Sequence, residues 1–302
     1  MSTSPFFSVV IPTYNRPEYL REAIQSVVSQ TFADFELIVV DDSPEETARP
    51  VIESFADVRL SYVTNDHSSG GAGTRNAGIE RARGTWVAFL DDDDLWLPQK
   101  LERQAEKIAG SDDQVALVYT GHTTFRQGSG RTFTFIPSKE GWIHEDLLAW
   151  NVINGFYSVA VRRDVLAKLG GLDERFPAMQ DAELYVRVAK EHKVAFVADP
   201  LVRVRDSEGG RITTNYTNKL RGSQLFWEKF QTDISKSFYL RHRAAARVFM
   251  FAFVKGDLRE LLRSTPLTLA GLFLDRKSFL YVSRFVARVS LDRLKSVTGS
   301  PQ

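Results

Sequence analysis

The amino-acid sequence predicts an α/β protein with a mostly parallel sheet flanked by helices and a C-terminal helical extension. Across residues 1–125, short apolar runs alternate with segments whose apolar residues recur at helical spacing. A strand–helix–strand series implies βαβ units and a mostly parallel sheet. From residue 218 onward the pattern is helical, and no strand is predicted there.

Four apolar runs are predicted strands, at residues 6–12, 35–40, 58–63 and 85–90. Residues 37–40 and 87–90 are apolar throughout, as expected for a sheet covered on both faces. Between the first two strands, five apolar residues spaced i, i+3, i+4, i+7 and i+8 from Leu20 predict a helix. Asn15 and Pro17 mark the start of that helix. A second helix is predicted at about residues 74–83.

The next part of the chain is more mixed. Strands are predicted at residues 115–119, 131–136 and 156–161, a hairpin loop at 127–130, a helix at 181–190 and an extended segment at 194–204. We therefore expect two domains, an α/β domain at residues 1–214 and a helical extension at 215–302. The charges divide in the same way. Residues 1–214 have a net charge of −9, and residues 215–302 have a net charge of +10.

Composition narrows the chemistry. The chain has no cysteine, so a metal would be held by oxygen or imidazole ligands. No basic residue precedes the first apolar run, so no signal peptide is predicted. The apolar run at residues 248–254 is far shorter than the roughly 20 residues that span a bilayer. We expect a cytoplasmic protein.

Acidic residues follow two of the predicted strands. Asp41 and Asp42 follow the second strand, and four consecutive aspartates, residues 91–94, follow the fourth. Ligands of an open parallel sheet bind outside the carboxyl ends of its strands. Four adjacent carboxylates repel one another unless a cation or a hydrogen-bonded ligand compensates. Oxygen ligands of this kind suit Mg²⁺ or Mn²⁺ bridged to substrate phosphates. The alternative is a solvated turn, but a turn needs only one capping aspartate.

Other ligand-binding motifs fail on spacing. An EF-hand that starts at Asp91 would need an oxygen ligand where Leu95 stands and a glycine where Trp96 stands. A dinucleotide-binding loop would need glycines after the first strand, where residues 12–17 contain none. The glycine-rich stretch near residue 73 has Asn76 in place of the third glycine, and no Walker-type phosphate loop is visible.

Five segments, in order, resemble glycosyltransferase family 2, a large group with the GT-A fold. They are Val-Val-Ile-Pro-Thr-Tyr-Asn-Arg at 9–16, residues 29–31 with 35–43, Gly-Thr-Arg-Asn-Ala-Gly-Ile at 73–79, Phe-Leu-Asp-Asp-Asp-Asp-Leu-Trp at 89–96, and Gly-Gly-Leu-Asp-Glu-Arg-Phe at 170–176 with Gln-Asp at 180–181. The resemblance covers roughly residues 6–205. Two positions depart from the family pattern, Thr74 in place of alanine and Gln180 in place of glutamate.

The resemblance implies metal-dependent, inverting transfer of a hexose from a nucleotide diphosphate sugar, UDP by family habit. The acceptor would be a hydroxyl on a growing cell-surface or lipid-linked glycan. Pro12 and Tyr14 would lie by the base and ribose, and Asp42 would accept from the base. Arg75 would lie near the donor diphosphate or sugar.

The same resemblance implies that Asp91 and Asp93 hold the Mg²⁺ or Mn²⁺, while Asp92 faces ribose or sugar. Asp181 matches the catalytic base. Inverting transfer needs a stabilised diphosphate leaving group and one positioned carboxylate that accepts a proton. A second interpretation makes Asp181 the N-cap of the helix that follows it, and the two roles are compatible.

Other conspicuous residues have simpler interpretations. The five histidines show no ligand spacing, so we expect surface or packing roles for His67, His122, His144, His192 and His242. Trp142 and Trp150 could stack on an acceptor sugar, although core packing is the preferred interpretation. Trp96 is expected to cover the sheet edge beside the metal.

Residues 218–302 lie outside the resemblance and combine basic residues with large apolar ones. Two interpretations stay open, a helix pair on an anionic membrane surface at the inner face of the cell membrane, or a small bundle with a solvated basic face. A lipid-linked acceptor would suit the first. No nucleic-acid partner is expected, since no aromatic-basic binding module is visible.

Three alternative functions remain to be weighed against the enzyme. The first is a non-catalytic nucleotide-sugar or glycan-binding protein of the same fold, which the intact acidic set disfavours. The second is a polyprenyl-phosphate glycosyl synthase. The third, a nucleotidyltransferase, would need a glycine-rich basic loop after the first strand, and the sequence has none.

Overall fold

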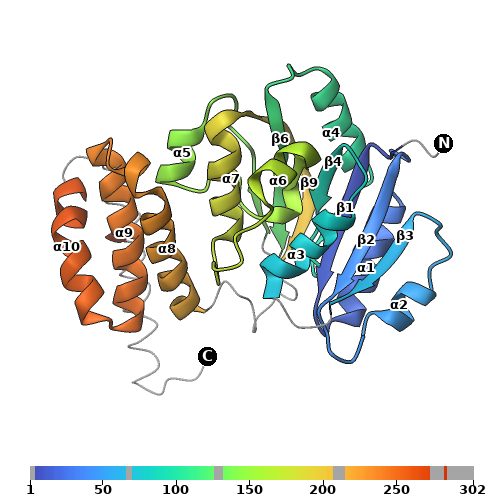
Figure 1. Ribbon diagram of the computed structural model, residues 1–302, viewed down its shortest axis with the longest axis horizontal. Helices are drawn as coiled ribbons and strands as arrows, with labels where there is room; N and C mark the ends of the chain where they lie inside the picture. The colour runs from blue at the N-terminus through green and yellow to red at the C-terminus, as the bar shows by residue number, and fades with distance from the viewer. Residues whose placement is uncertain (1–3, 66–69, 126–131, 207–214, 273–281, 284–302) are drawn as a thin grey trace. The chain divides into compact units, whose positions relative to one another are not determined.

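The computed structural model describes residues 4–65, 70–125, 132–206, 215–272 and 282–283. The chain forms two compact units (Figure 1). The first comprises Met1–Leu147, Asn151–Arg175 and Gln180–Glu208. The second comprises Leu148–Trp150, Phe176–Met179 and Gly209–Gln302.

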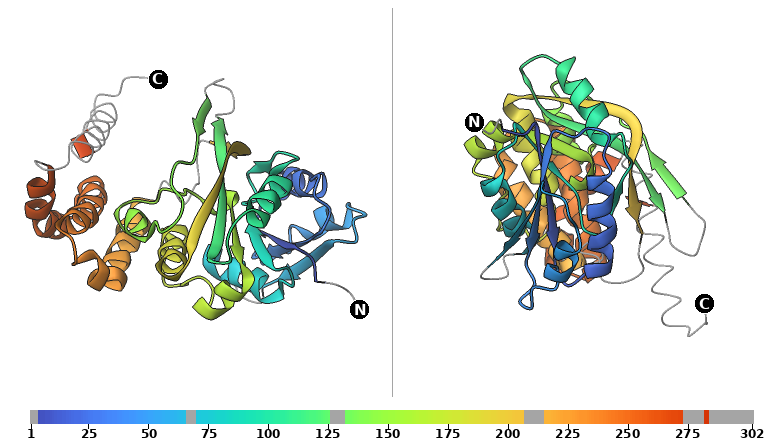
Figure 2. Two further views of the ribbon diagram at one scale, coloured as in Figure 1. Left: turned by 90° about the horizontal axis from the view of Figure 1, so that it is seen from above. Right: turned by 90° about the vertical axis from the view of Figure 1, so that its right-hand side faces the viewer.

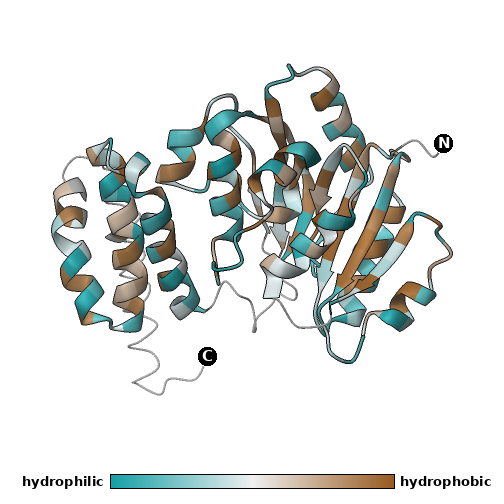
Figure 3. Ribbon diagram, in the orientation of Figure 1, coloured by the Kyte–Doolittle hydropathy of each residue, from teal (hydrophilic) through white to brown (hydrophobic). Residues whose placement is uncertain are grey.

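One nine-stranded sheet runs through the described part of the first unit, in the order β3-β2-β1-β4-β8-β6-β9-β5, with β7 paired to β6. The strands are β1 Phe7–Thr13, β2 Phe35–Asp41, β3 Leu60–Thr64, β4 Trp86–Phe89, β5 Leu95–Trp96, β6 Val115–Phe125, β7 Thr132–Phe135, β8 Val159–Arg162 and β9 Lys193–Arg205. Their apolar residues, brown along β2 in Figure 3, supply most of a core of buried side chains.

The first four strands of that order pair in parallel. They are connected by the crossover helices α1 Pro17–Val28, α2 Arg49–Glu53 and α3 Gly70–Arg81. Helix α3 begins at Gly70, before the predicted residue 74. The prediction missed its first turn because that turn is rich in glycine and lacks the apolar period that marks a helix. Gly78 of α3 packs directly on Val10 of β1. The parallel register places the ends of β1 and β2 side by side, with Thr13 opposite Asp41.

The second half of the sheet is mixed. β8 runs antiparallel to both β4 and β6, β7 and β5 are antiparallel edge strands, and β9 is parallel to β6. The α/β class and helix-flanked sheet are therefore confirmed, with the continuous parallel region confined to β3-β2-β1-β4. The predicted strand at 156–161 is divided, because the backbone N–H of Ser158 donates to Gly155 O and closes a 3-10 turn, η1 Phe156–Ser158, before β8 begins. The predicted hairpin loop at 127–130 lies outside the described residues.

Helices cover both faces of this mixed region. They are α4 Lys100–Ala109, α5 His144–Ala149, α6 Arg163–Leu169 and α7 Gln180–Glu191. Figure 2 shows α4 and α7 on opposite sides of β6 and β9. The predicted helix at 181–190 and extended segment at 194–204 are confirmed as α7 and β9.

Three helices of the second unit follow, α8 Tyr216–Ile234, α9 Phe238–Lys255 and α10 Leu258–Leu272. They confirm the helical pattern after residue 218, and α9 packs against both α8 and α10. Because the second unit also takes in Leu148–Trp150 and Phe176–Met179, a functional division at residue 214 stays a prediction. None of the described helices is long and apolar enough to cross a membrane.

The contact between α3 and β1 gives a stability prediction. A β-carbon at Gly78 would lie 2.4 Å from Val10 Cγ1, inside the closely packed core. Gly78→Ala should therefore lower the free energy of unfolding by about 1–3 kcal/mol, despite the better helix propensity of alanine. Urea denaturation measures this. At Gly110, where a β-carbon would meet no atom closer than 3.5 Å, Gly110→Ala should have an effect of about 0.5 kcal/mol or less. Equal stability of the two variants would contradict the packing argument.

Candidate active site

The carboxyl ends of β1, β2 and β4 meet at one edge of the sheet, as parallel pairing requires. Thr13, at the end of β1, donates from Oγ1 to Asp92 Oδ2 at 2.8 Å. Its carbonyl accepts from the backbone N–H of Asp42 at 3.0 Å. The structure therefore brings the two acidic segments predicted from sequence to the same place.

The four consecutive aspartates, residues 91–94, which we call the acidic loop, are held by partners from different segments. Arg16 Nη1 lies 3.4 Å from Asp92 Oδ1 and 3.1 Å from Asp93 Oδ2. Asp94 is buried and accepts from the backbone N–H of Arg205 at 2.9 Å. Asp91 pairs with the guanidinium of Arg75.

Asp92 shows how strongly these carboxylates are crowded. Burial, followed by the like charges of Asp93 and Asp91, raises its pKa to about 6, although the hydrogen bond from Thr13 and the charge of Arg16 act in the opposite direction. A nearby cation would relieve this repulsion.

Arg75 is fixed at the junction of α3, η1 and the acidic loop. Its Nη1 donates to Gly71 O at 2.8 Å, and its guanidinium carbon lies 4.6 Å from the centre of the Phe156 ring. Its Nη2 donates to Asp91 Oδ1. Its Nε is buried and has no hydrogen-bond partner among the described residues. One donor of a tightly held guanidinium is thus buried without a hydrogen bond in the described part of the chain.

Asp181 lies close enough to Asp91 of the acidic loop for the charge of Asp91 to act on its carboxylate. A β-carbon built on Gly71 would lie 3.0 Å from Arg75 Nη1 and 3.5 Å from Gln180 Oε1, so the first turns of α3 and α7 are adjacent. Burial raises the pKa of Asp181 to about 6, the N–H of Ala182 and the charge of Arg75 lower it, and Asp91 raises it. Its carboxylate therefore interacts electrostatically with Arg75 and Asp91.

The position of Asp181 is also set by hydrogen bonding. Asn151 Nδ2 donates to Asp181 Oδ2 at 3.0 Å. Asn151 Oδ1 in turn accepts from the backbone N–H groups of Ile153 and Asn154, which fixes the amide. Helix α7 begins at Gln180, so Asp181 lies within its first turn and not at the predicted N-cap position.

Two tyrosines near Asp181, Tyr185 and Tyr157, were not predicted from the sequence as part of the site. Tyr185 is fully buried one helical turn after Asp181, and its hydroxyl has no hydrogen-bond partner among the described residues. Burial raises the pKa of Tyr157, and the charges of Asp94, Asp91 and Asp181 add to this effect. The i, i+4 spacing of Asp181 and Tyr185 was visible in the sequence as a shared helix face. The position of Tyr157 was not, since it depends on the turn before β8.

The predicted nucleotide-side residues lie at the ends of β1 and β2. Pro12 is buried in β1 opposite Val40, and Tyr14 is 51% exposed. The Asp42 carboxylate accepts from Asn65 Nδ2 at 2.9 Å and from the backbone N–H of Gly70 at 3.2 Å. Stacking by Tyr14 and base recognition by Asp42 stay predictions.

The histidines and tryptophans mostly pack. His122 is buried, stacks on Phe135 at 5.1 Å and has a pKa lowered to about 4 by burial. His67 lies outside the described residues. Trp96 is 3% exposed, and its Nε1 donates to Tyr157 O at 2.8 Å. Core packing of Trp142 is wrong, because this edge residue is 57% exposed.

The donor set fits a Mg²⁺ or Mn²⁺ ion held partly by substrate. No group of three or more His, Asp or Glu residues in the described segments could hold a metal alone. Such ions are commonly bound by one or two carboxylates together with substrate phosphates. Asp91 and Asp93 offer hard oxygen ligands at side chains that are 29% and 13% exposed. The roles of both as ligands stay predictions.

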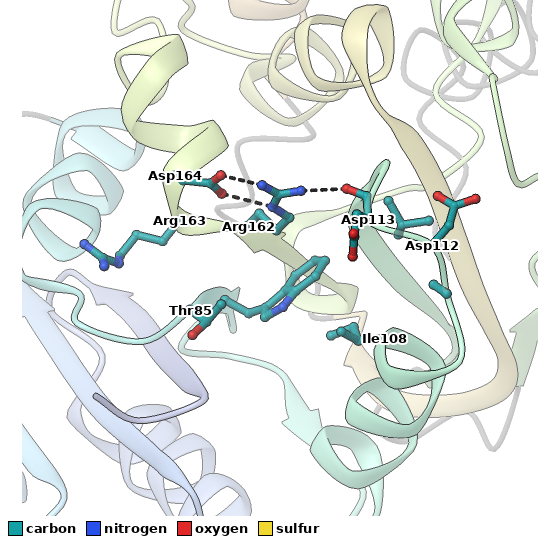
Figure 4. A pocket seen from close by; sticks show the side chains of 10 residues that line it. Thr85, Ile108, Asp112, Asp113, Arg162, Arg163 and Asp164 are labelled. Carbon is teal, nitrogen blue, oxygen red and sulfur yellow. Dashed lines mark hydrogen bonds and ion pairs between the residues drawn. The ribbon is translucent and has the colours of Figure 1, made fainter. Parts of the chain in front are cut away.

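A hollow of about 580 Å³ lies at the other end of β4 (Figure 4). It is lined by Thr85 and Trp86 at the start of that strand and by Arg162, which pairs with Asp164 and donates to Asp113 O at 2.8 Å. The acidic loop follows the opposite end of β4. This hollow is therefore separate from the candidate active site.

Residues 8–170 match the family model described as Glycosyl transferase family 2. The chain belongs to this family. A curated relative, the UDP-Glc:alpha-D-GlcNAc-diphosphoundecaprenol beta-1,3-glucosyltransferase WfgD of Escherichia coli, is 40% identical over 250 residues, which cover 82% of this chain and 95% of that protein. Matches to two other curated relatives span only 62% and 63% of those proteins.

Two solved structures share the fold. The first 349 residues of Staphylococcus aureus TarS, in complex with UDP-GlcNAc, match with a TM-score of 0.65 and 19% identity, over 82% of this chain and 72% of that one. The mannosyltransferase PcManGT of Pyrobaculum calidifontis, in complex with GDP-Man and Mn²⁺, matches with a TM-score of 0.59 and 19% identity, over 97% and 88%. The GT-A fold implied by sequence resemblance is thus confirmed.

The buried hydroxyl of Tyr185 gives a second prediction. Because it has no partner in the described structure, Tyr185→Phe should leave the free energy of unfolding unchanged or raise it by about 1 kcal/mol. Thermal or urea denaturation measures this. Tyr119→Phe is the matched control, since the Tyr119 hydroxyl donates to Lys139 O at 2.8 Å and its loss should destabilise by about 1 kcal/mol. A marked loss of stability in Tyr185→Phe would show that the hydroxyl is bonded.

Proposed function

We propose that this protein is a metal-dependent, inverting glycosyltransferase that transfers a hexose from a nucleotide diphosphate sugar to a hydroxyl on a growing, lipid-linked cell-surface glycan. The observation that carries the proposal is the placement of Asp181. A separate carboxylate with a raised pKa shares its surroundings with Arg75 and with the acidic loop at the strand ends. Inverting transfer needs a carboxylate that accepts a proton close to the groups that stabilise the departing diphosphate.

The donor is proposed to be a UDP-sugar. Support comes from the 40% identical relative, whose name specifies UDP-Glc, and from the family to which the chain belongs. Asp42, Pro12 and Tyr14 would bind the nucleoside at the ends of β1 and β2. Asp92, fixed by Thr13, would face the ribose or sugar.

Charge on the diphosphate would be met from two sides. Arg75 points its guanidinium at the acidic loop and keeps one buried donor without a partner. Asp91 and Asp93 would hold Mg²⁺ or Mn²⁺, which when bound stabilises the departing diphosphate as a Lewis acid. The arginines that pair with these aspartates in the protein alone would then be released toward the phosphates.

Asp181 would accept the proton of the acceptor hydroxyl. As it does so, the acceptor oxygen would form the new bond to the anomeric carbon, and the bond from that carbon to the diphosphate would break. Asn151 orients the carboxylate by donating to Oδ2. Attack from the face opposite the leaving group inverts the anomeric centre. We place this reaction in the cytoplasm, in keeping with a chain that lacks cysteine.

Asp181→Asn should lower kcat by about a hundredfold to ten-thousandfold, because the amide cannot accept the proton, while UDP-sugar binding is retained. Transfer assays and isothermal titration measure the two quantities. Asp164→Asn is a matched control, since Asp164 also lies in the first turn of a helix but lines the separate hollow at the far end of β4. Full turnover by Asp181→Asn would overturn the proposed role.

The rate should depend on pH through Asp181. Its pKa is raised to about 6, so the carboxylate that must accept a proton becomes protonated below that pH. The groups that act on it are Arg75, which lowers the pKa, and Asp91, which raises it. kcat/KM should fall about tenfold per pH unit below the pKa of Asp181, which a divalent cation bound beside Asp91 would lower from its value in the protein alone. The same fall in Asp181→Asn would exclude Asp181 as its cause.

Turnover should stop in excess chelator and return with Mn²⁺ or Mg²⁺. In Asp93→Asn, the Mn²⁺ affinity measured with UDP present should fall at least about tenfold, because a direct oxygen ligand is lost. Electron paramagnetic resonance of unbound Mn²⁺ gives this affinity without an activity assay. Asp112→Asn, at an exposed ion pair with Lys193, should bind Mn²⁺ as the unmodified protein does. Undiminished turnover in chelator would refute metal dependence.

A further inference from the structure

Helix α10 has the reverse of the polarity expected for a helix at the surface of a water-soluble bundle. Its buried residues include Glu260, Ser264 and Thr268, at 9%, 5% and 1% exposure. Three leucines on it are exposed instead, Leu258 and Leu262 at 68% and Leu269 at 50%. At 100° per residue these leucines fall within about 40° of one another around the helix axis, on the side opposite the buried polar residues. We call this surface the leucine face.

The buried hydroxyl groups of α10 are hydrogen-bonded. Ser264 Oγ donates to Glu260 O at 2.6 Å and Thr268 Oγ1 donates to Ser264 O at 2.8 Å, so both hydroxyls are satisfied within the helix. Small side chains at i and i+4 let α10 approach α9 closely, where Ala244, Ala245 and Ala252 are buried. Helices packed through small residues, with leucines turned outward, are typical of proteins in contact with lipid.

Basic residues border the leucine face. Arg259 and Arg263 are exposed and fall about 60–140° around the axis from the leucines, along one margin of the stripe. Arginines beside an apolar stripe can reach headgroups while the leucines enter the acyl boundary. Residues 215–302 carry 16 Lys and Arg against 6 Asp and Glu. The partner of this face should therefore be both apolar and anionic.

Charge separates the candidate partners. A second copy of the chain that packed leucine face against leucine face would bring Arg259 and Arg263 against residues of the same sign. The chain's own residues 273–302 carry six Lys and Arg against two Asp, which is again the same sign. An anionic bilayer offers negative headgroups around an apolar interior, which matches both components of the face.

We infer that the leucine face of α10 binds the surface of an anionic lipid bilayer, with Leu258, Leu262 and Leu269 inserted at the acyl boundary and Arg259 and Arg263 against phosphate headgroups. The inference concerns the second unit alone and does not depend on the proposed transfer reaction. It would place a lipid-linked acceptor and the enzyme on one surface.

Co-sedimentation of the full chain with vesicles tests this inference. The protein should bind vesicles of phosphatidylcholine with phosphatidylglycerol and remain in solution with phosphatidylcholine alone. In the double variant Leu258→Gln, Leu262→Gln the partition coefficient should fall at least about tenfold, because two exposed leucines no longer enter the bilayer. In Arg259→Gln, Arg263→Gln it should also fall about tenfold, and its salt dependence should weaken.

Val58→Gln is the matched control, since Val58 is a fully exposed apolar residue of the first unit, at 102% exposure. Its binding to vesicles should be unchanged. All variants should retain the thermal midpoint of the unmodified protein and its transfer to a water-soluble acceptor, so that failure of this inference and failure of the proposed function are distinguishable.

Four results would overturn the inference. The unmodified protein could stay in solution with anionic vesicles, or the leucine variant could bind them as well as the control does. A lower thermal midpoint in the leucine variant would show that the chain itself buries these side chains. A dimer that dissociates in the leucine variant, measured by analytical ultracentrifugation, would assign the face to a second copy.

Discussion

Repulsion among four consecutive carboxylates is the constraint around which the site is organised. Residues 91–94 follow a buried strand, and each is held by a donor from elsewhere in the chain. Arg16, just before α1, reaches Asp92 and Asp93, while Arg75 of α3 pairs with Asp91. The N–H of Arg205, at the end of β9, binds Asp94. The acidic loop therefore ties together the start, the middle and the end of the first unit.

In the proposed mechanism, these same contacts would prepare the loop for a polyanionic ligand. In the protein alone the arginines pair with the aspartates, while burial, together with the like charges of Asp93 and Asp91, raises the pKa of Asp92. A divalent cation on the aspartates and a diphosphate on the arginines would exchange one set of pairs for another without leaving a charge unpaired. Such an exchange costs little reorganisation because the backbone is already fixed by Thr13 and Arg205.

The mixed half of the sheet serves a different purpose. The turn η1 and strand β8 insert between β4 and β6, and this places Phe156 under Arg75 and Tyr157 near the acidic loop. Helix α7 then presents Asp181 from the covering layer. In the proposed mechanism, the base would come from an element that follows the donor-binding strands in sequence, so different parts of one unit would contribute the donor and acceptor functions.

The sequence by itself determined the parallel strands, the helix at Asp181, the acidic loop and the family, because each is encoded in short segments with strong apolar periodicity or in fixed motifs. Tertiary structure alone decided which arginine pairs with which aspartate, the antiparallel course of β8, the burial of Tyr185 and the outward leucines of α10. These features depend on pairing between residues far apart in the chain. On α10, only the packing of the helix against α9, in which Ser264 and Thr268 are buried, determines that the leucines point outward.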